Sequence, residues 1–176
     1  MQQEITRVAL DAMGGDNAPG ELVKGAVDAV NGRSDIKVLL VGQQDVVEKE
    51  LKQYSYPKEQ IEVVHAEEVI ETAEPPVNAI RKKKQSSIVV GMNMVKQKEA
   101  DAFVSAGSSG AILVGGQVLI GKGKGVKRAP LAPLTPTAKG VFAFKLTAVR
   151  MSMPVQNIFL QFCTDGFYFI WRTLSV

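Results

Sequence analysis

An α/β fold with a largely parallel sheet is predicted by three observations. Short apolar segments alternate along the chain with segments whose apolar residues recur at helical spacing. One short segment, Ile36–Val41, is an apolar run closed by Gly42, which is typical of a strand buried on both faces. Stretches rich in turn residues follow the first and fourth short segments, and strands that alternate with helices in this way favour a parallel sheet.

The first half of the chain supplies three predicted strands, at residues 5–10, 36–41 and 61–66. Between the first two strands, Pro19 suits the first turn of a helix because its missing N–H costs nothing there. Apolar residues recur at helical spacing from Leu22 to Val30, and Gly32 is the expected end of this helix. A second amphipathic helix is predicted from Val46, Val47 and Leu51.

The second half continues the pattern. Residues 77–98 are predicted to be helical in two pieces, with a basic run between them. Residues 100–105 form the fourth predicted strand, and residues 111–120 form an apolar helix. Residues 126–134 are expected to be extended or a loop, because three prolines lie in and after this segment up to Pro136.

Composition limits the class of protein. The 176 residues carry a net charge of +3 and one cysteine. This length suits one domain, at roughly 150 residues per domain, and one cysteine excludes an internal disulfide framework. No apolar run reaches the roughly 18 residues of a membrane-spanning helix, and the N-terminus lacks the pattern of a secretory signal. A cytoplasmic protein is therefore expected.

The composition changes near residue 141. Residues 1–140 hold 18 Lys and Arg against 17 Asp and Glu, so most of the basic excess lies after them. The later segment also holds eight aromatic residues, the single Trp and the single Cys. Two segments of different origin are predicted, 1–140 and 141–176, and an aromatic-rich structural element is the alternative. The even charge balance of residues 1–140 leaves no support for a nucleic-acid partner.

Two loops are candidates for ligand binding, because ligands of open parallel sheets bind outside the carboxyl ends of the strands. Asp11–Asn17 follows the first strand, and Ser105–Gly110 follows the fourth. Glycines allow close approach of the backbone to a ligand, and backbone N–H groups at a helix start favour phosphate. The candidate binding residues are therefore Gly14, Gly15, Ser105, Gly107, Ser109 and Gly110.

Each loop also has a structural interpretation. The spacing of Gly14 and Gly15 matches neither a dinucleotide-binding loop nor a Walker A loop. The first loop could be a tight turn in which Asp16 or Asn17 caps the helix, and Ser108 or Ser109 could cap the helix after the second loop.

The basic run Arg81-Lys82-Lys83-Lys84 is either a solvated face or a positive rim that attracts an acidic partner or a phosphorylated ligand. No aromatic residue interleaves with it, which argues against a nucleic-acid surface. With His65 as the only histidine, neither a metal site nor a hydrolase triad is predicted.

Several segments resemble the bacterial PlsX phosphate acyltransferases over about residues 4–140. The most specific is the opening Asp11-Ala12-Met13-Gly14-Gly15-Asp16-Asn17-Ala18-Pro19. Further segments agree in order and spacing: Leu40-Val41-Gly42, His65-Ala66, Glu68-Val69-Ile70, Ala79 through Lys84 with Ser86-Ser87, Ala100-Asp101-Ala102, Ser105-Ala106-Gly107, Gly125-Val126 and Arg128 through Pro136.

The resemblance implies a Rossmann-like three-layer α/β/α fold of the isopropylmalate dehydrogenase type, here truncated. It also implies transfer of a fatty acyl group from acyl carrier protein to orthophosphate, giving acyl phosphate for phospholipid synthesis, without cofactor or metal. Phosphate held by the two loops would attack the thioester directly, with Asp16, Asn17 and Ser108 as the catalytic candidates. Acyl carrier protein, being acidic, would suit the basic run.

Other partners follow from the resemblance alone. It implies a homodimer for the full-length family, and contact with the inner membrane face or with a downstream acyltransferase is a further expectation. Two alternatives stay open for the function. One is a related phosphotransacylase that uses acyl-CoA, and the other is a non-catalytic fragment.

The sequence departs from the family pattern at three places. The family often has Asn-Thr at the position of Ser108-Ser109, and Arg128-Ala129-Pro130 differs from its usual Arg-Pro-Ala order. After residue 140 the expected continuation, Asp-x-Gly-Ala-Asn-x-Asp, is missing. We hypothesise that residues from about 141 onward are translated in a shifted frame.

The genetic code gives this hypothesis a test. One allowed set of codons for residues 146–158, read two nucleotides later, encodes Asp-Cys-Gly-Ala-Asn-Val-Asp, and the fixed codons of Met151 and Met153 fit. Sequencing the encoding DNA is expected to recover this offset reading. DNA whose shifted frame cannot encode the family segment would exclude the frameshift.

Overall fold

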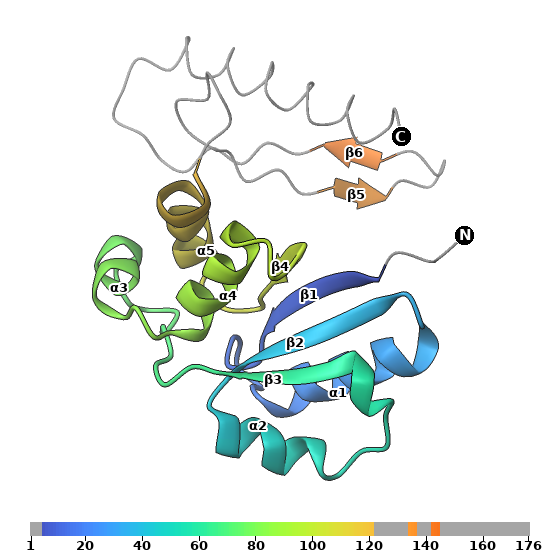
Figure 1. The fold of residues 1–176 in the computed structure, drawn as a ribbon. Coiled ribbons are helices and arrows are strands. Elements are labelled where there is room, and N and C mark those ends of the chain that lie inside the picture. Colours follow the sequence, from blue (N-terminus) through green and yellow to red (C-terminus); the bar gives the residue numbers. More distant parts are fainter. Residues whose placement is uncertain (1–4, 122–133, 137–141, 145–176) are drawn as a thin grey trace. The chain divides into compact units, whose positions relative to one another are not determined.

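The structure is a computed structural model that describes residues 5–121, 134–136 and 142–144. The chain divides after Gly121 into two compact units. In the first unit, strands and helices alternate around an all-parallel sheet (Figure 1), so the α/β prediction is confirmed. The second unit contains the short antiparallel pair β5 (Leu134–Pro136) and β6 (Phe142–Phe144).

Four parallel strands form the sheet, in the order β3-β2-β1-β4. They are β1 (Thr6–Asp11), β2 (Ile36–Gly42), β3 (Ile61–His65) and β4 (Ala102–Val104). Leu10 of β1 lies opposite Leu40 of β2 on one side and Val104 of β4 on the other. This register brings the carboxyl ends of β1 and β4 to the same edge of the sheet.

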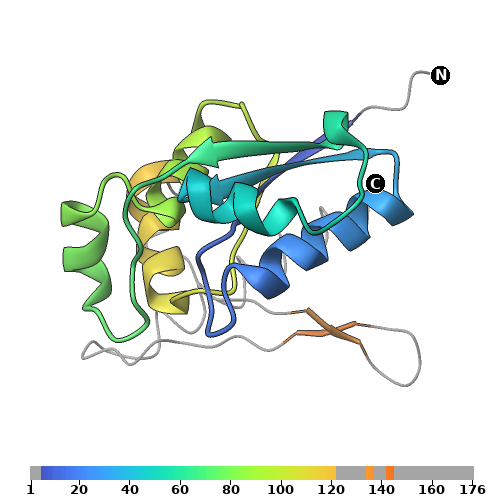
Figure 2. The ribbon, with the colours of Figure 1, turned by 90° about the horizontal axis from the view of Figure 1, so that it is seen from below.

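One face of the sheet is covered by α1 (Gly20–Gly32) and α2 (Gln44–Leu51), as Figure 2 shows from below. Alternate residues of β2, among them Val38 and Leu40, point into this layer and are at most 4% exposed. They pack with apolar residues of the two helices, chiefly Val23, Val27, Val30, Val47 and Leu51. The short 3-10 turn η1 (Lys58–Gln60), which periodicity does not predict, leads into β3.

The opposite face carries α4 (Ser87–Lys96). Leu39 and Val41, the intervening residues of β2, pack there against Ala9 of β1 and Met94 of α4. Both faces of β2 are therefore buried, as its apolar run predicts. Together the helices and the sheet make the predicted three-layer arrangement.

A further group of helices packs on α4: α3 (Pro76–Lys82), α5 (Ser109–Gly115) and the π-helical turn η2 (Gly116–Ile120). Their shared core includes Ile80, Ile88, Met92 and Ala111. The predicted break in residues 77–98 lies between α3 and α4. Ser86 ends this break by accepting a hydrogen bond from the Val89 N–H at 3.4 Å as the N-cap of α4.

Two expectations fall mostly outside the described residues. The extended segment 126–134 is described only at Leu134, and the segment 141–176 only at residues 142–144. Within the described part of the chain, no helix is long and apolar enough to cross a membrane.

Two helical glycines allow a matched test of the packing between α4 and the sheet. A Cβ on Gly91 of α4 would lie 2.5 and 2.7 Å from two ring carbons of Phe103, whereas no described atom lies within 4 Å of one on Gly25 of α1. We expect Gly25→Ala to stabilise the chain by about 1 kcal/mol, because alanine favours helix. Gly91→Ala should instead destabilise it by about 1–3 kcal/mol, because the core is overpacked. Urea unfolding measures both, and equal gains would contradict the packing at Phe103.

Candidate functional site

The two glycine-containing loops leave the sheet side by side. β1 ends at Asp11 and β4 ends at Val104. Because Leu10 pairs with Val104, the next residue of each chain segment, Asp11 and Ser105, comes together at the carboxyl edge. The sequence prediction that both loops meet at one edge of the sheet is confirmed by this register.

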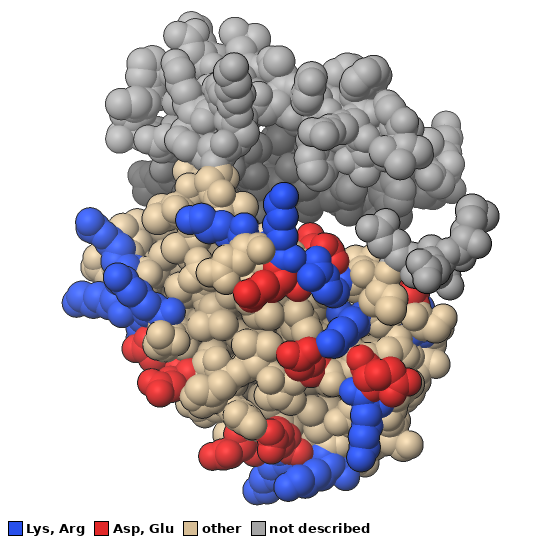
Figure 3. All heavy atoms as spheres, in the orientation of Figure 1, with Lys and Arg blue, Asp and Glu red and all other residues tan. Residues whose placement is uncertain are grey.

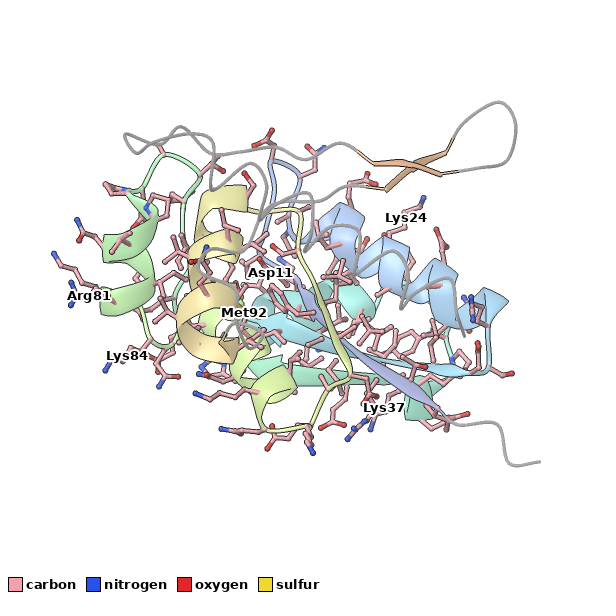
Figure 4. All side chains as sticks on the ribbon, turned by 90° about the horizontal axis from the view of Figure 1, so that it is seen from above. Asp11, Lys24, Lys37, Arg81, Lys84 and Met92 are labelled. Atoms are coloured by element: carbon pink, nitrogen blue, oxygen red, sulfur yellow. The ribbon has the colours of Figure 1, made fainter. Side chains whose placement is uncertain are left out.

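A buried carboxylate joins the loops. Asp11 is only 1% exposed, and Figure 4 shows it in the interior of the unit. Its Oδ2 accepts a hydrogen bond from the Ser105 hydroxyl at 2.7 Å, and its Oδ1 accepts one from the Met13 backbone N–H at 3.0 Å. The Ser105 Oγ in turn accepts a bond from the Gly107 backbone N–H at 3.0 Å. One side chain thus holds the start of both loops.

The hydrogen bonds of Asp11 offset a large free-energy cost of burying its carboxylate. Burying a carboxylate without partners costs several kcal/mol or more, whereas a hydrogen bond to a charged group contributes about 1.5–3 kcal/mol. The two donors that reach Asp11 come from different loops. If either loop moves away, the buried carboxylate loses one of its two hydrogen bonds. The carboxylate therefore selects the conformation in which the loops lie together.

Glycine is required where the loops touch. A Cβ on Gly14 would lie 2.5 Å from Asp11 Oδ2, 2.8 Å from the Gly107 nitrogen and 2.9 Å from Ser105 Oγ. Gly15 has a φ of +98°, in the region that favours glycine. A Cβ on Gly15 would also lie 3.3 Å from the Cβ of Ala106. The two glycines thus serve a close approach of backbone to backbone.

The second loop leads directly into α5. Ser108 is 5% exposed, and its hydroxyl oxygen accepts a hydrogen bond from the Ala111 N–H at 3.3 Å. Ser108 is thus the N-cap of α5, which confirms the structural alternative for this residue. Ser109 is exposed beside it. A Cβ on Gly110 would lie 2.7 Å from Pro76, so the start of α3 packs beside this loop.

The first loop leads into α1 without a side-chain cap. The N-cap position is Pro19, so the expected cap by Asp16 or Asn17 is wrong. The physical reason is that the helix starts at Gly20, too far along the chain for these residues to occupy the cap position. Asp16 and Asn17 are exposed, and neither side chain forms a hydrogen bond with another described residue.

The basic run does not act as one surface. Lys83 is half-buried, and its ammonium donates to the Val69 carbonyl and to the Glu74 carboxylate. The bond from Lys83, followed by one from the Glu71 backbone N–H, holds the pKa of Glu74 below its ordinary value. Lys83 therefore ties down the segment between β3 and α3, which corrects the expectation that it belongs to an exposed rim.

The other three basic residues are exposed, and we refer to Arg81, Lys82 and Lys84 as the basic patch. Figure 3 shows Lys and Arg side chains gathered on the α3 side of the unit, and Arg81 and Lys84 point outward in Figure 4. Pro76, at the other end of α3, is the part that touches the second loop. The patch thus begins at Arg81, five residues and about 7.5 Å along the helix axis from Pro76.

Sequence reasoning missed Asp11, the residue that joins the loops. A signal was present, because Ala9 and Asp11 are two apart on one strand and share a face of the sheet. A carboxylate on a buried face needs partners, yet the chain alone does not reveal that one of them is 94 residues away. Among the described residues, no group of three or more His, Cys, Asp or Glu could hold a metal ion.

The family model described as fatty acid synthesis protein, FA_synthesis, matches residues 6–168. A phosphate acyltransferase of Alkaliphilus oremlandii is 53% identical over 170 residues, which are 97% of this chain and 50% of the relative. One of Clostridium acetobutylicum is 45% identical over 169 residues, or 96% and 51%. Another, of Clostridium kluyveri, is 44% identical over 135 residues, or 77% and 40%.

The chain spans about half the length of the curated relatives it matches. The family match extends past residue 140, and the predicted division there stays a prediction. The resemblance seen in the opening motif and the later collinear segments is confirmed by these similarities. The chain belongs to the fatty acid synthesis protein family, the family of the PlsX phosphate acyltransferases.

Proposed function

We propose that the protein transfers a fatty acyl group from acyl carrier protein to orthophosphate, and that the two loops of this chain bind the phosphate. The observation that carries the proposal is the junction of the loops around Asp11 and Ser105 at the carboxyl edge of the sheet. The similarity to phosphate acyltransferases supports the reaction class.

Binding of phosphate requires hydrogen-bond donors and no covalent bond to the protein. Gly14 and Gly15 keep side chains away from the backbone of the first loop, and Gly107 does so in the second. Backbone N–H groups beside such glycines are suited to bind an anion. Ser109 and Gly110 add exposed or half-exposed groups next to them. In this proposal Ser105 supports the loop, because its hydroxyl is already bonded to Asp11.

The proposed chemistry is a direct acyl transfer. A phosphate oxygen attacks the thioester carbonyl, a C–O bond forms, the C–S bond breaks, and the phosphate proton passes to the departing thiolate. The tetrahedral intermediate carries an oxyanion, which hydrogen-bond donors stabilise. The Asn17 amide and the Ser108 hydroxyl are candidate donors, and the Asp16 carboxylate is a candidate proton acceptor.

The donor of the acyl group is proposed from charge. Acyl carrier proteins are acidic, so the basic patch offers a complementary surface. Lys83 takes no part, because it pairs with Glu74. The homodimer that the resemblance implies for the full-length family, and contact with the inner membrane face or with a downstream acyltransferase, stay predictions.

Each of the two alternative functions predicts a different experimental outcome. A phosphotransacylase that uses acyl-CoA would form acyl phosphate from acyl-CoA without needing the basic patch. A non-catalytic fragment would bind phosphate and form no acyl phosphate. A chimera with a relative separates these functions from the proposed one, because the relatives belong to the same family and are about twice as long as this chain.

The loops are tested in a chimera in which residues 1–140 replace the matching part of the Alkaliphilus oremlandii relative. We expect it to form acyl phosphate from acyl carrier protein thioester and orthophosphate, measured by trapping with hydroxylamine. Asp16→Ala, Asn17→Ala and Ser108→Ala should each lower the rate, by roughly 100-fold where a transition-state donor is lost. Full activity in all three variants would contradict the proposed roles.

A matched pair of glycine variants tests the contact between the loops in the same chimera. Gly14→Ala should abolish activity, because its Cβ would overlap Asp11 and the second loop. Gly20→Ala, six residues later, would meet only the Glu50 carboxylate at 3.7 Å and should keep activity. Equal activity of the two variants would show that contact between the loops is dispensable.

The basic patch is tested by charge reversal. We expect Lys82→Glu combined with Lys84→Glu to raise the KM for acyl carrier protein at least tenfold, because rim charges steer association. The KM for phosphate should stay unchanged. Lys49→Glu with Lys52→Glu, an equal change of charge on exposed residues at the end of α2, is the control. An equal rise of KM in both double variants would point to net charge and against a docking surface.

A further inference from the structure

We infer that Asp11 is a positioning residue, which fixes the two loops as one unit and turns the Ser105 hydroxyl proton inward, away from any bound phosphate. The inference rests on the proposed phosphate site. It assigns to Asp11 a role that acts through Ser105 and through the Met13 backbone, without contact with the substrate.

The direction of each hydrogen bond follows from the chemistry of the groups. The Gly107 N–H can only donate, so the Ser105 oxygen accepts in that contact. The Ser105 hydroxyl then directs its own proton to Asp11 Oδ2, 2.7 Å away. Because this proton is committed, Ser105 cannot donate it to a phosphate oxygen at the same time. Ser105 acts instead by holding the Gly107 backbone.

Both oxygens of Asp11 are required as hydrogen-bond acceptors. Its two oxygens accept from two donors, the Met13 N–H and the Ser105 hydroxyl. An asparagine at this position has one oxygen that accepts and one NH₂ group that donates. It can therefore accept a hydrogen bond from only one of the two donors. If its NH₂ group faces Ser105, the serine oxygen receives two donors and its proton must turn outward.

The surroundings leave little room for another arrangement. Asp11 is 1% exposed, and the contact of Gly14 with Gly107 admits no side chain. Asp11 is also the last residue of β1, which lies between β2 and β4 in the sheet. The carboxylate is therefore fixed by the sheet, and the loops adapt to it.

The first experiment measures binding of inorganic phosphate to the 176-residue chain by calorimetry. The variants are Asp11→Asn, Ser105→Ala and the two combined. We expect each single variant to weaken binding about tenfold or more, and the double variant to be no weaker than either single one, because both changes break one connection. If the loss of phosphate affinity in the double variant equals the product of the losses in the two single variants, the role of Ser105 as the intermediary is overturned.

Two controls match these variants in chemistry and lie outside the loops. Asp101→Asn removes a carboxylate whose pKa is lowered by hydrogen bonds from Arg7. Ser86→Ala removes a fully buried serine that caps α4. Both should lower the unfolding midpoint and leave the phosphate affinity unchanged. If Ser86→Ala weakens phosphate binding as much as Ser105→Ala, the positioning role is overturned in favour of general destabilisation.

A second measurement decides the question without phosphate. Amide hydrogen exchange in the unmutated chain should show Met13 and Gly107 opening together, since both depend on Asp11. In Ser105→Ala the Met13 amide, in the other loop, should exchange faster while β2 stays protected. Unchanged exchange at Met13 would overturn the inference. Coupled exchange without phosphate binding would instead reject the proposed phosphate site and keep Asp11 as the link between the loops.

Discussion

The hydrogen bond between Ser105 and the buried Asp11 carboxylate is the interaction on which the candidate site depends. It connects the last residue of β1 with the residue that follows β4, 94 residues further along the chain. The parallel register brings the two residues together, and the carboxylate then requires donors from both loops. The need for glycine at position 14 follows from this, because its backbone meets that of Gly107 where a side chain would stand.

Much of the fold could be predicted from the sequence, because periodicity is a local property. The apolar run of β2 indicated burial on both faces, and Leu39 and Leu40 do point into opposite layers. The break between α3 and α4 followed from the charged run. Local pattern gave no account of partners that come from distant segments. The ion pair of Lys83 with Glu74 and the bonds of Asp11 depend on folded geometry, as does the start of α1 at Gly20.

The position of the candidate site was predicted from the sequence better than the roles of its individual residues. Both loops lie at the predicted edge, because the carboxyl ends of parallel strands converge there. The roles inside the loops differ from simple expectation. Ser108 caps α5 and Ser105 is bonded to Asp11, while Asp16 and Asn17 stay exposed without a described partner. The chain belongs to a family whose relatives are about twice as long, so the proposed reaction is that of a protein of which the loops and the basic patch are parts.

Titration of the chain with inorganic phosphate, followed by amide NMR, tests whether the two loops form one phosphate-binding unit. We expect the amide signals of Gly14, Gly15, Gly107 and Ser109 to shift together with one dissociation constant. The signals of Arg81, Lys82 and Lys84 should shift little. Shifts confined to these basic residues, or different constants for the two loops, would contradict a single phosphate-binding unit.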